Sequence, residues 1–173
     1  MSAITRMLVP TDFGATSDLA VRYATELARK VGASIHLLHV IEEPAYSAAY
    51  SDGYFVNAAE LRQPLIDQAQ RRLAAAVKRC APVPTTTDIQ FGRPAQAIGE
   101  QALTRGTDLI IMGTHGRGVV AHLFVGSVAE RVVRTAPCPV LTVRDTNRTA
   151  DARRAEARAE DAHATDPMCL VTK

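Results

Sequence analysis

Short apolar runs alternate with stretches of helical periodicity along this chain, and that alternation limits the folds open to it. The runs that predict strands are Met7–Pro10, Ser34–Ile41, Leu109–Met112 and Pro139–Val143, and Thr85–Phe91 is assigned as the third strand in chain order. In the segments between them, apolar residues recur at the spacing of one face of a helix. Strands joined through helices form a parallel sheet with right-handed crossovers and helices on both faces. The sequence therefore predicts an open α/β fold with a five-stranded parallel sheet.

The first two expected helices have recognisable ends. Thr16, Ser17 or Asp18 can cap the first helix, because their side chains accept hydrogen bonds from free N–H groups. Gly32 is expected to end it. Pro64 suits the first turn of the second helix, which is expected to run to about Cys80 (residues 64–80).

The remaining segments are assigned in the same way. Helices are expected over residues 94–102 and over 128–134, the latter beginning near the preceding Gly-Ser pair. Residues 42–59 show no sustained period and are expected to form a long loop. The last strand, residues 139–143, follows a proline and is expected at an edge of the sheet.

A glycine-rich stretch joins the fourth predicted strand to the last predicted helix. The segment Gly113-Thr-His-Gly116 is followed after nine residues by Gly126-Ser127, so four of the chain's ten glycines lie between positions 113 and 126. Glycine lets backbone N–H groups approach an anion closely, and a helix N-terminus adds free donors and a positive dipole end. The stretch predicts a phosphate-binding loop. The alternative is that these glycines only turn the chain and cap the helix.

Two parts of the chain resemble the universal stress protein family. Residues 108–143 read DLIIMGTHGRGVVAHLFVGSVAERVVRTAPCPVLTV, and their Gly-x2-Gly-x9-Gly-Ser pattern matches the family's ATP-binding subgroup. Residues 7–42 read MLVPTDFGATSDLAVRYATELARKVGASIHLLHVIE and resemble the family from its first strand to its second. The resemblance covers about residues 3–144. It implies a Rossmann-like sheet in the order 3-2-1-4-5, with a ligand site where that order reverses.

The resemblance also implies which residues bind ATP. Asp12 matches an aspartate that contacts the nucleotide in the family, although from the residue alone it can equally cap the turn into the first helix. Val40 matches a position whose backbone contacts adenine. Arg117 either neutralises phosphate or is simply solvated. The expected nucleotide-binding residues are Pro10, Thr11, Asp12, Val40, Met112, Gly113, Thr114, Gly116, Arg117, Gly126, Ser127 and Val128.

No metal site made of protein ligands is predicted. His36 and His39 lie on opposite faces of one strand and cannot chelate together. Mg²⁺ is expected to arrive with ATP, which is the other expected cofactor.

Composition excludes several classes of function. The net charge is only +2 and no basic stripe is present, so nucleic-acid binding is not expected. No segment approaches the ~20 apolar residues of a membrane span, and the first residues lack a signal-peptide pattern, so a cytoplasmic protein is expected. The three cysteines are far apart, which favours free thiols over disulfides.

The chain is expected to form one nucleotide-binding domain, residues 1–144, followed by a charged, alanine-rich tail, residues 145–173, that ends in the apolar stub 168–172. The resembling family dimerises through its fifth strand, which implies a homodimer through residues 139–143. A protein partner that recognises the nucleotide-bound state is also possible.

The preferred interpretation is an ATP-binding universal stress protein that acts as a nucleotide-responsive stress regulator. One alternative is a slow ATPase or self-phosphorylating enzyme that uses the same pocket. No catalytic residue is assigned, because the chain has no Gly-x4-Gly-Lys-Ser/Thr motif to support phosphoryl transfer. The other alternative is a dimeric interaction module without nucleotide, which the intact glycine pattern disfavours.

Overall fold

The computed structural model describes residues 3–42, 58–114 and 126–144. Strands and helices alternate along these residues, as the apolar periodicity predicts. The elements are, in chain order, β1 (Arg6–Pro10), α1 (Ala15–Val31), β2 (Ser34–Ile41), α2 (Ala58–Cys80), β3 (Thr85–Phe91), α3 (Pro94–Thr104), β4 (Leu109–Gly113), α4 (Ser127–Thr135) and β5 (Val140–Val143).

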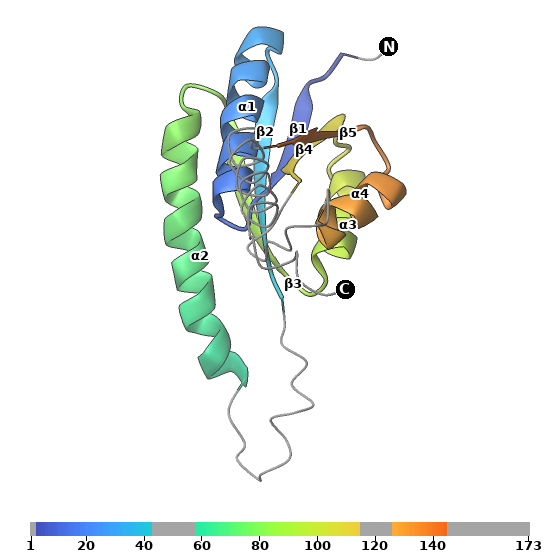
Figure 1. The fold of residues 1–173 in the computed structure, drawn as a ribbon. Helices are drawn as coiled ribbons and strands as arrows, with labels where there is room; N and C mark the ends of the chain where they lie inside the picture. The colour runs from blue at the N-terminus through green and yellow to red at the C-terminus, as the bar shows by residue number, and fades with distance from the viewer. Residues whose placement is uncertain (1–2, 43–57, 115–125, 145–173) are drawn as a thin grey trace, which may run out of the picture.

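The five strands form one parallel sheet in the order β3-β2-β1-β4-β5 (Figure 1). This arrangement confirms the predicted fold class and places the reversal of strand order between β1 and β4. Strand β5 lies at an edge, as the preceding proline predicts. The Pro139 carbonyl still accepts a hydrogen bond of 3.0 Å from the Ile110 N–H, so the proline does not interrupt pairing with β4.

Two helices cover each face of the sheet (Figure 1). Helices α1 and α2 pack on one face over a cluster that includes Val9, Leu37 and Leu73, each at most 2% exposed. Helices α3 and α4 pack on the other face over a cluster that includes Leu8 and Ile110, both fully buried. Alternate residues of β1, β2 and β4 therefore enter different clusters, which explains why these strands read as nearly continuous apolar runs.

Helix α1 starts differently from the prediction. Its N-cap residue is Gly14, and no side chain makes the capping hydrogen bond. Thr16, Ser17 and Asp18 all lie inside the helix, so each was wrong as a predicted cap. The Ser17 hydroxyl instead donates to the Gly14 carbonyl over 2.9 Å. The reason is that the preceding turn already starts the helix at Ala15, before the apolar pattern begins.

Helix α2 begins earlier than predicted. It runs from Ala58 and contains Pro64 in its interior rather than in its first turn, so the predicted start was wrong. Proline removes one backbone hydrogen bond from a helix. Pro64 is exposed, while Ala69 and Leu73 are buried on the inner face and hold the helix against the sheet. The helix also includes the last two residues of the predicted loop, 58 and 59, and residues 43–57 of that loop lie outside the described part of the chain.

No helix within the described ranges is both long enough and apolar enough to cross a membrane. The tail, residues 145–173, lies outside these ranges. Its predicted separation from the first 144 residues stays a prediction.

Helix α1 approaches strand β4 so closely at Gly113 that a larger residue does not fit. A Cβ atom at this position would lie 2.9 Å from Thr16 Cγ2 and 3.0 Å from both the carbonyl carbon and the oxygen of Thr16. Gly113 was predicted as part of a phosphate-binding loop. In the structure its missing side chain also lets the start of α1 pack against the carboxyl end of β4.

We expect Gly113→Ala to lower the free energy of unfolding by roughly 1–3 kcal/mol, because α1 would have to move away from β4. Gly99→Ala is the matched control. Gly99 lies in α3 with no atom within 4 Å of an added Cβ, so this change should raise the free energy by about 0.5–1 kcal/mol through helix propensity. Urea unfolding measures both. A Gly113→Ala protein as stable as the wild type would contradict the close-packing argument.

Strand β2 carries a buried histidine. His36 pairs with Leu8 of β1 and Thr86 of β3, and only 7% of it is exposed. Its Nδ1 lies 2.8 Å from Thr86 Oγ1, whereas its Nε2 has no hydrogen-bond partner among the described residues. Burial, followed by the nearby Arg105 guanidinium, lowers the pKa of His36 from 6.5 to about 4, although Asp88 acts in the opposite direction. His36 is therefore neutral in the folded protein at neutral pH.

This pKa predicts a loss of stability in mild acid. Between pH 6.5 and about 4 the unfolded chain takes up a proton at His36 that the folded protein does not. The stability is fully present above pH 6.5 and falls by up to ~3 kcal/mol as the pH approaches 4. His36→Asn keeps a polar atom near Thr86 but cannot titrate. Unfolding in urea from pH 7 to pH 4 should show a smaller fall for the variant, and parallel profiles would contradict the assignment.

Candidate functional site

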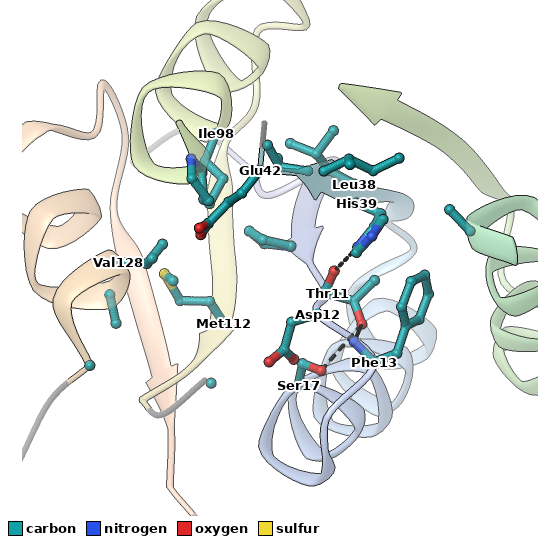
Figure 2. A pocket seen from close by; sticks show the side chains of 18 of the residues that line it. Thr11, Asp12, Phe13, Ser17, Leu38, His39, Glu42, Ile98, Met112 and Val128 are labelled. Atoms are coloured by element: carbon teal, nitrogen blue, oxygen red, sulfur yellow. Dashed lines mark hydrogen bonds between the residues drawn. The ribbon is translucent and has the colours of Figure 1, made fainter. Parts of the chain in front are cut away.

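A cavity of about 640 Å³ opens at the carboxyl end of the sheet. Its lining comes from the ends of β1, β2 and β4, the turn before α1, helices α2 and α3, and the start of α4 (Figure 2). Open parallel sheets bind ligands at this end, where the strand order reverses. The volume lies within the range of roughly 300–1,000 Å³ that is typical of small-molecule sites.

Most of the residues predicted from the sequence meet at this cavity. Those that line it are Pro10, Thr11, Asp12, Val40, Met112, Gly113, Thr114, Gly126, Ser127 and Val128. The other two, Gly116 and Arg117, lie outside the described residues. Residues from segments far apart in the chain thus converge on one cavity, as the sheet order requires.

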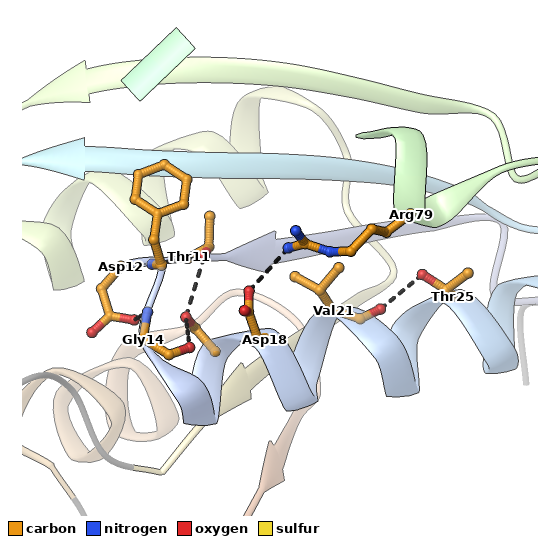
Figure 3. A network of polar contacts seen from close by, with 9 residues as sticks. Thr11, Asp12, Gly14, Asp18, Val21, Thr25 and Arg79 are labelled. Carbon is orange, nitrogen blue, oxygen red and sulfur yellow. Dashed lines mark hydrogen bonds and ion pairs between the residues drawn. The ribbon is translucent and has the colours of Figure 1, made fainter. Parts of the chain in front are cut away.

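The turn between β1 and α1 is held by its own side chains (Figure 3). Thr11 Oγ1 accepts a hydrogen bond of 3.0 Å from the Phe13 N–H, and Asp12 Oδ1 accepts one of 2.9 Å from the Gly14 N–H. The Thr11 hydroxyl also donates to Ser17 Oγ over 3.2 Å. Asp12 therefore stabilises the turn, as one interpretation expected, and it also lines the cavity, where a carboxylate can accept hydrogen bonds from a ligand.

Helix α4 directs its N-terminus at the cavity. Its N-cap is Gly126, with φ −66° and ψ 149°, and no side chain caps the helix. The Gly126 N–H donates to the Thr114 carbonyl over 2.6 Å, so this donor is already used. The next three residues, Ser127, Val128 and Ala129, line the cavity, and the N–H groups of a first helical turn have no partner within the helix. Their positive dipole end favours an anion.

One part of the lining is apolar. Leu38, Ile98 and Met112 belong to the buried cluster beneath α3 and α4, and Val40 packs against it. The Glu42 side chain extends toward Met112 in Figure 2. This part of the cavity suits a flat apolar group that carries polar atoms at its edge.

The side of the cavity formed by α2 and the residues next to it was not predicted from the sequence. This side consists of Phe13, His39, Leu65, Gln68, Ala69 and Arg72. Nothing in the local pattern identifies them, because Gln68 and Arg72 read as the solvated face of an amphipathic helix. Only the packing of α2 over the sheet brings them to the cavity.

Among the described residues, no group of three or more His, Cys, Asp or Glu side chains could hold a metal ion. The expectation that Mg²⁺ arrives with the nucleotide therefore stays a prediction. Asp12 is the carboxylate at the turn that could hold such an ion through water.

Comparison with known proteins shows a family profile that matches most of this chain. The profile of the Universal stress protein family matches residues 3–144. Universal stress protein MJ0531 of Methanocaldococcus jannaschii is 31% identical over 142 residues, which cover 80% of this chain and 81% of that protein.

Solved structures agree in fold. The structure of MJ0577, another universal stress protein of Methanocaldococcus jannaschii, matches with a TM-score of 0.74 at 27% identity and covers 83% of this chain and 98% of that one. A universal stress protein from Archaeoglobus fulgidus, solved in complex with dAMP, has a TM-score of 0.58 at 20% identity and covers 82% of this chain and 99% of that one. At that identity the likeness concerns the fold.

Proposed function

This chain belongs to the universal stress protein family, and from that premise we propose that it binds ATP in the cavity and acts as a nucleotide-responsive regulator of the stress response. The observation that carries the proposal is the convergence of Asp12, Gly113 and the start of α4 on one cavity. Gly113 and the start of α4 belong to the glycine pattern that resembles the family's ATP-binding subgroup, and Asp12 matches an aspartate that contacts the nucleotide in the family.

Each part of ATP has a chemical match in the lining. The phosphates would accept hydrogen bonds from the free N–H groups at the start of α4. A ribose hydroxyl would donate to the Asp12 carboxylate. The adenine would lie against Val40, Ile98 and Met112, which present apolar surface. Bound Mg²⁺ would offset the phosphate charge.

The lining favours binding over catalysis. No lysine lies among the described residues of the cavity, and the chain lacks the P-loop motif that supplies one. The backbone donors at α4 would stabilise phosphate charge in the ground state and in the transition state alike. Such donors increase the affinity for the nucleotide but do not accelerate its hydrolysis. We therefore propose that any hydrolysis of ATP is slow.

A bound nucleotide would act as a signal by connecting separate segments. It would bridge the turn before α1, the end of β2 and the start of α4, all of which line the cavity. A partner protein could then recognise the surface around the filled cavity. We propose the cytoplasm as the location, because ATP is available there.

We also propose that the protein forms a homodimer through strand β5. This strand lies at the edge of the sheet. The Pro139 carbonyl accepts a hydrogen bond from Ile110 of β4, and the Val143 carbonyl accepts one from Thr114, just after β4. Backbone groups alternate in direction along a strand, so those of Thr142 point outward. An edge with unpaired backbone groups can pair with a second copy across a two-fold axis.

The ATP proposal is tested by Gly126→Val. The backbone at Gly126 has φ −66° and ψ 149°, which any residue adopts, so the change adds a side chain beside the α4 donors without backbone strain. We expect ATP affinity to fall on the order of a hundredfold, since two charge-assisted hydrogen bonds would be lost. Calorimetric titration with MgATP measures it, with Gly99→Val in α3 as the matched control. Equal affinities of wild type and Gly126→Val would remove the start of α4 from the site.

The dimer is tested by Thr142→Pro, which removes one outward N–H from β5 and leaves the hydrogen bonds to β4 in place. We expect this variant to be a monomer at concentrations where the wild type is a dimer, and Thr142→Val, which keeps the N–H, to behave as the wild type. Light scattering across a dilution series measures the oligomeric state of each protein. A wild-type monomer at high micromolar concentration would refute the proposal.

A further inference from the structure

Helix α2 brings one cation to the cavity, Arg72. Because α2 and α4 lie on opposite faces of the sheet, Arg72 approaches the cavity from the side opposite the α4 N-terminus. Its guanidinium carbon lies 5.3 Å from the centroid of the Phe13 ring. The Phe13 ring in turn lies 4.4 Å from the His39 ring, centroid to centroid. We refer to Arg72, Phe13 and His39 as the aromatic stack.

Arg72 has no acidic partner within the described part of the chain, in contrast to the arginines that form ion pairs. Arg79 of the same helix pairs with Asp18 at 3.1 Å, and Arg134 pairs with Glu130 at 3.2 Å. Arg72 makes neither an ion pair nor a hydrogen bond within the described part of the chain. It is also the one Lys or Arg among the described residues that line the cavity. Its charge is therefore available to a ligand.

The aromatic stack is held in place at a cost in backbone strain. Phe13 has φ 61°, a left-handed conformation that costs a bulky residue on the order of 1 kcal/mol or more. Its N–H donates to Thr11 Oγ1 over 3.0 Å, and His39 Nδ1 lies 2.7 Å from the Thr11 carbonyl oxygen. These contacts fix the ring on which the Arg72 guanidinium lies.

A guanidinium that lies on an aromatic ring keeps N–H groups at its edge, and these match two oxygens of a phosphate. Two carboxylates, Asp12 and Glu42, also line the cavity and would repel an anion. A phosphorylated ligand would therefore be stabilised by a cation of the protein, in addition to the uncharged donors of α4 and to any Mg²⁺ that it carries.

We infer that Arg72 binds a phosphate group of the ligand and makes the site selective for nucleotides over nucleosides. The inference rests on the proposed function for the identity of the ligand as an adenine nucleotide. It assigns phosphate recognition to two elements on opposite faces of the sheet, the start of α4 and the aromatic stack on the α2 side.

The test is a calorimetric titration of the wild type, Arg72→Gln and Arg71→Gln with three probes: MgATP, adenosine and inorganic tripolyphosphate. Arg71 is the matched control, because it is an exposed neighbour on the same helix and is not part of the lining. We expect Arg72→Gln to weaken the binding of ATP and of tripolyphosphate on the order of ten- to a hundredfold. The affinity for adenosine should stay unchanged. Arg71→Gln should change none of the three affinities.

Four outcomes would overturn the inference: unchanged ATP affinity in Arg72→Gln, an equal loss of ATP affinity in Arg71→Gln, an equal loss of adenosine affinity in Arg72→Gln, or no binding of any probe by the wild type. If ATP affinity is unchanged in Arg72→Gln while the wild type binds ATP, the inference fails and the proposed function stands. If the wild type binds tripolyphosphate through Arg72 but binds no adenine nucleotide, the proposed function fails and the role of Arg72 stands. If the wild type binds none of the probes, both are wrong.

Discussion

The close approach of helix α1 to strand β4 at Gly113 is the contact on which the cavity depends. Because Gly113 has no side chain, the backbone of Thr16 lies directly against the end of β4. The turn before α1 is thereby held beside Thr114, whose carbonyl accepts the Gly126 N–H. The absence of a side chain at Gly113 thus allows the start of α1 to lie close to the segment that leads into α4. Asp12 and the start of α4 therefore line a single cavity.

The charges around that cavity favour a ligand of mixed character. The α4 N-terminus offers neutral backbone donors, and the carboxylates of Asp12 and Glu42 repel bare anions. A suitable ligand presents hydroxyl or amino donors to these carboxylates, apolar surface to Met112 and phosphate to α4. Each of these three parts of the lining then has a matching group on the ligand. This combination fits the proposed role, since a protein that responds to a nucleotide needs selective binding and no fast chemistry.

Much of the fold and of the site could be predicted from local patterns. Strands β1, β2 and β4 were predicted because their residues are largely apolar on both faces, which follows from burial under helices on each side. Helix ends were less predictable. The start of α2 at Ala58 was missed because Pro64 is a strong local signal for a first turn, whereas burial of Leu73 and its neighbours keeps the helix continuous past the proline. The cap of α1 was missed because the turn before it supplies its own hydrogen bonds.

The sequence by itself determined the order of the elements, the family, and ten of the described residues around the cavity, because apolar runs and glycine spacing are properties of short segments. Only the tertiary structure decided that Gly113 packs against α1, that the Gly126 N–H is already bonded, and that Arg72 lies on the Phe13 ring. These facts depend on distances between atoms of segments far apart in the chain. Such distances are set by how helices pack on the sheet, and no local pattern of residues contains them.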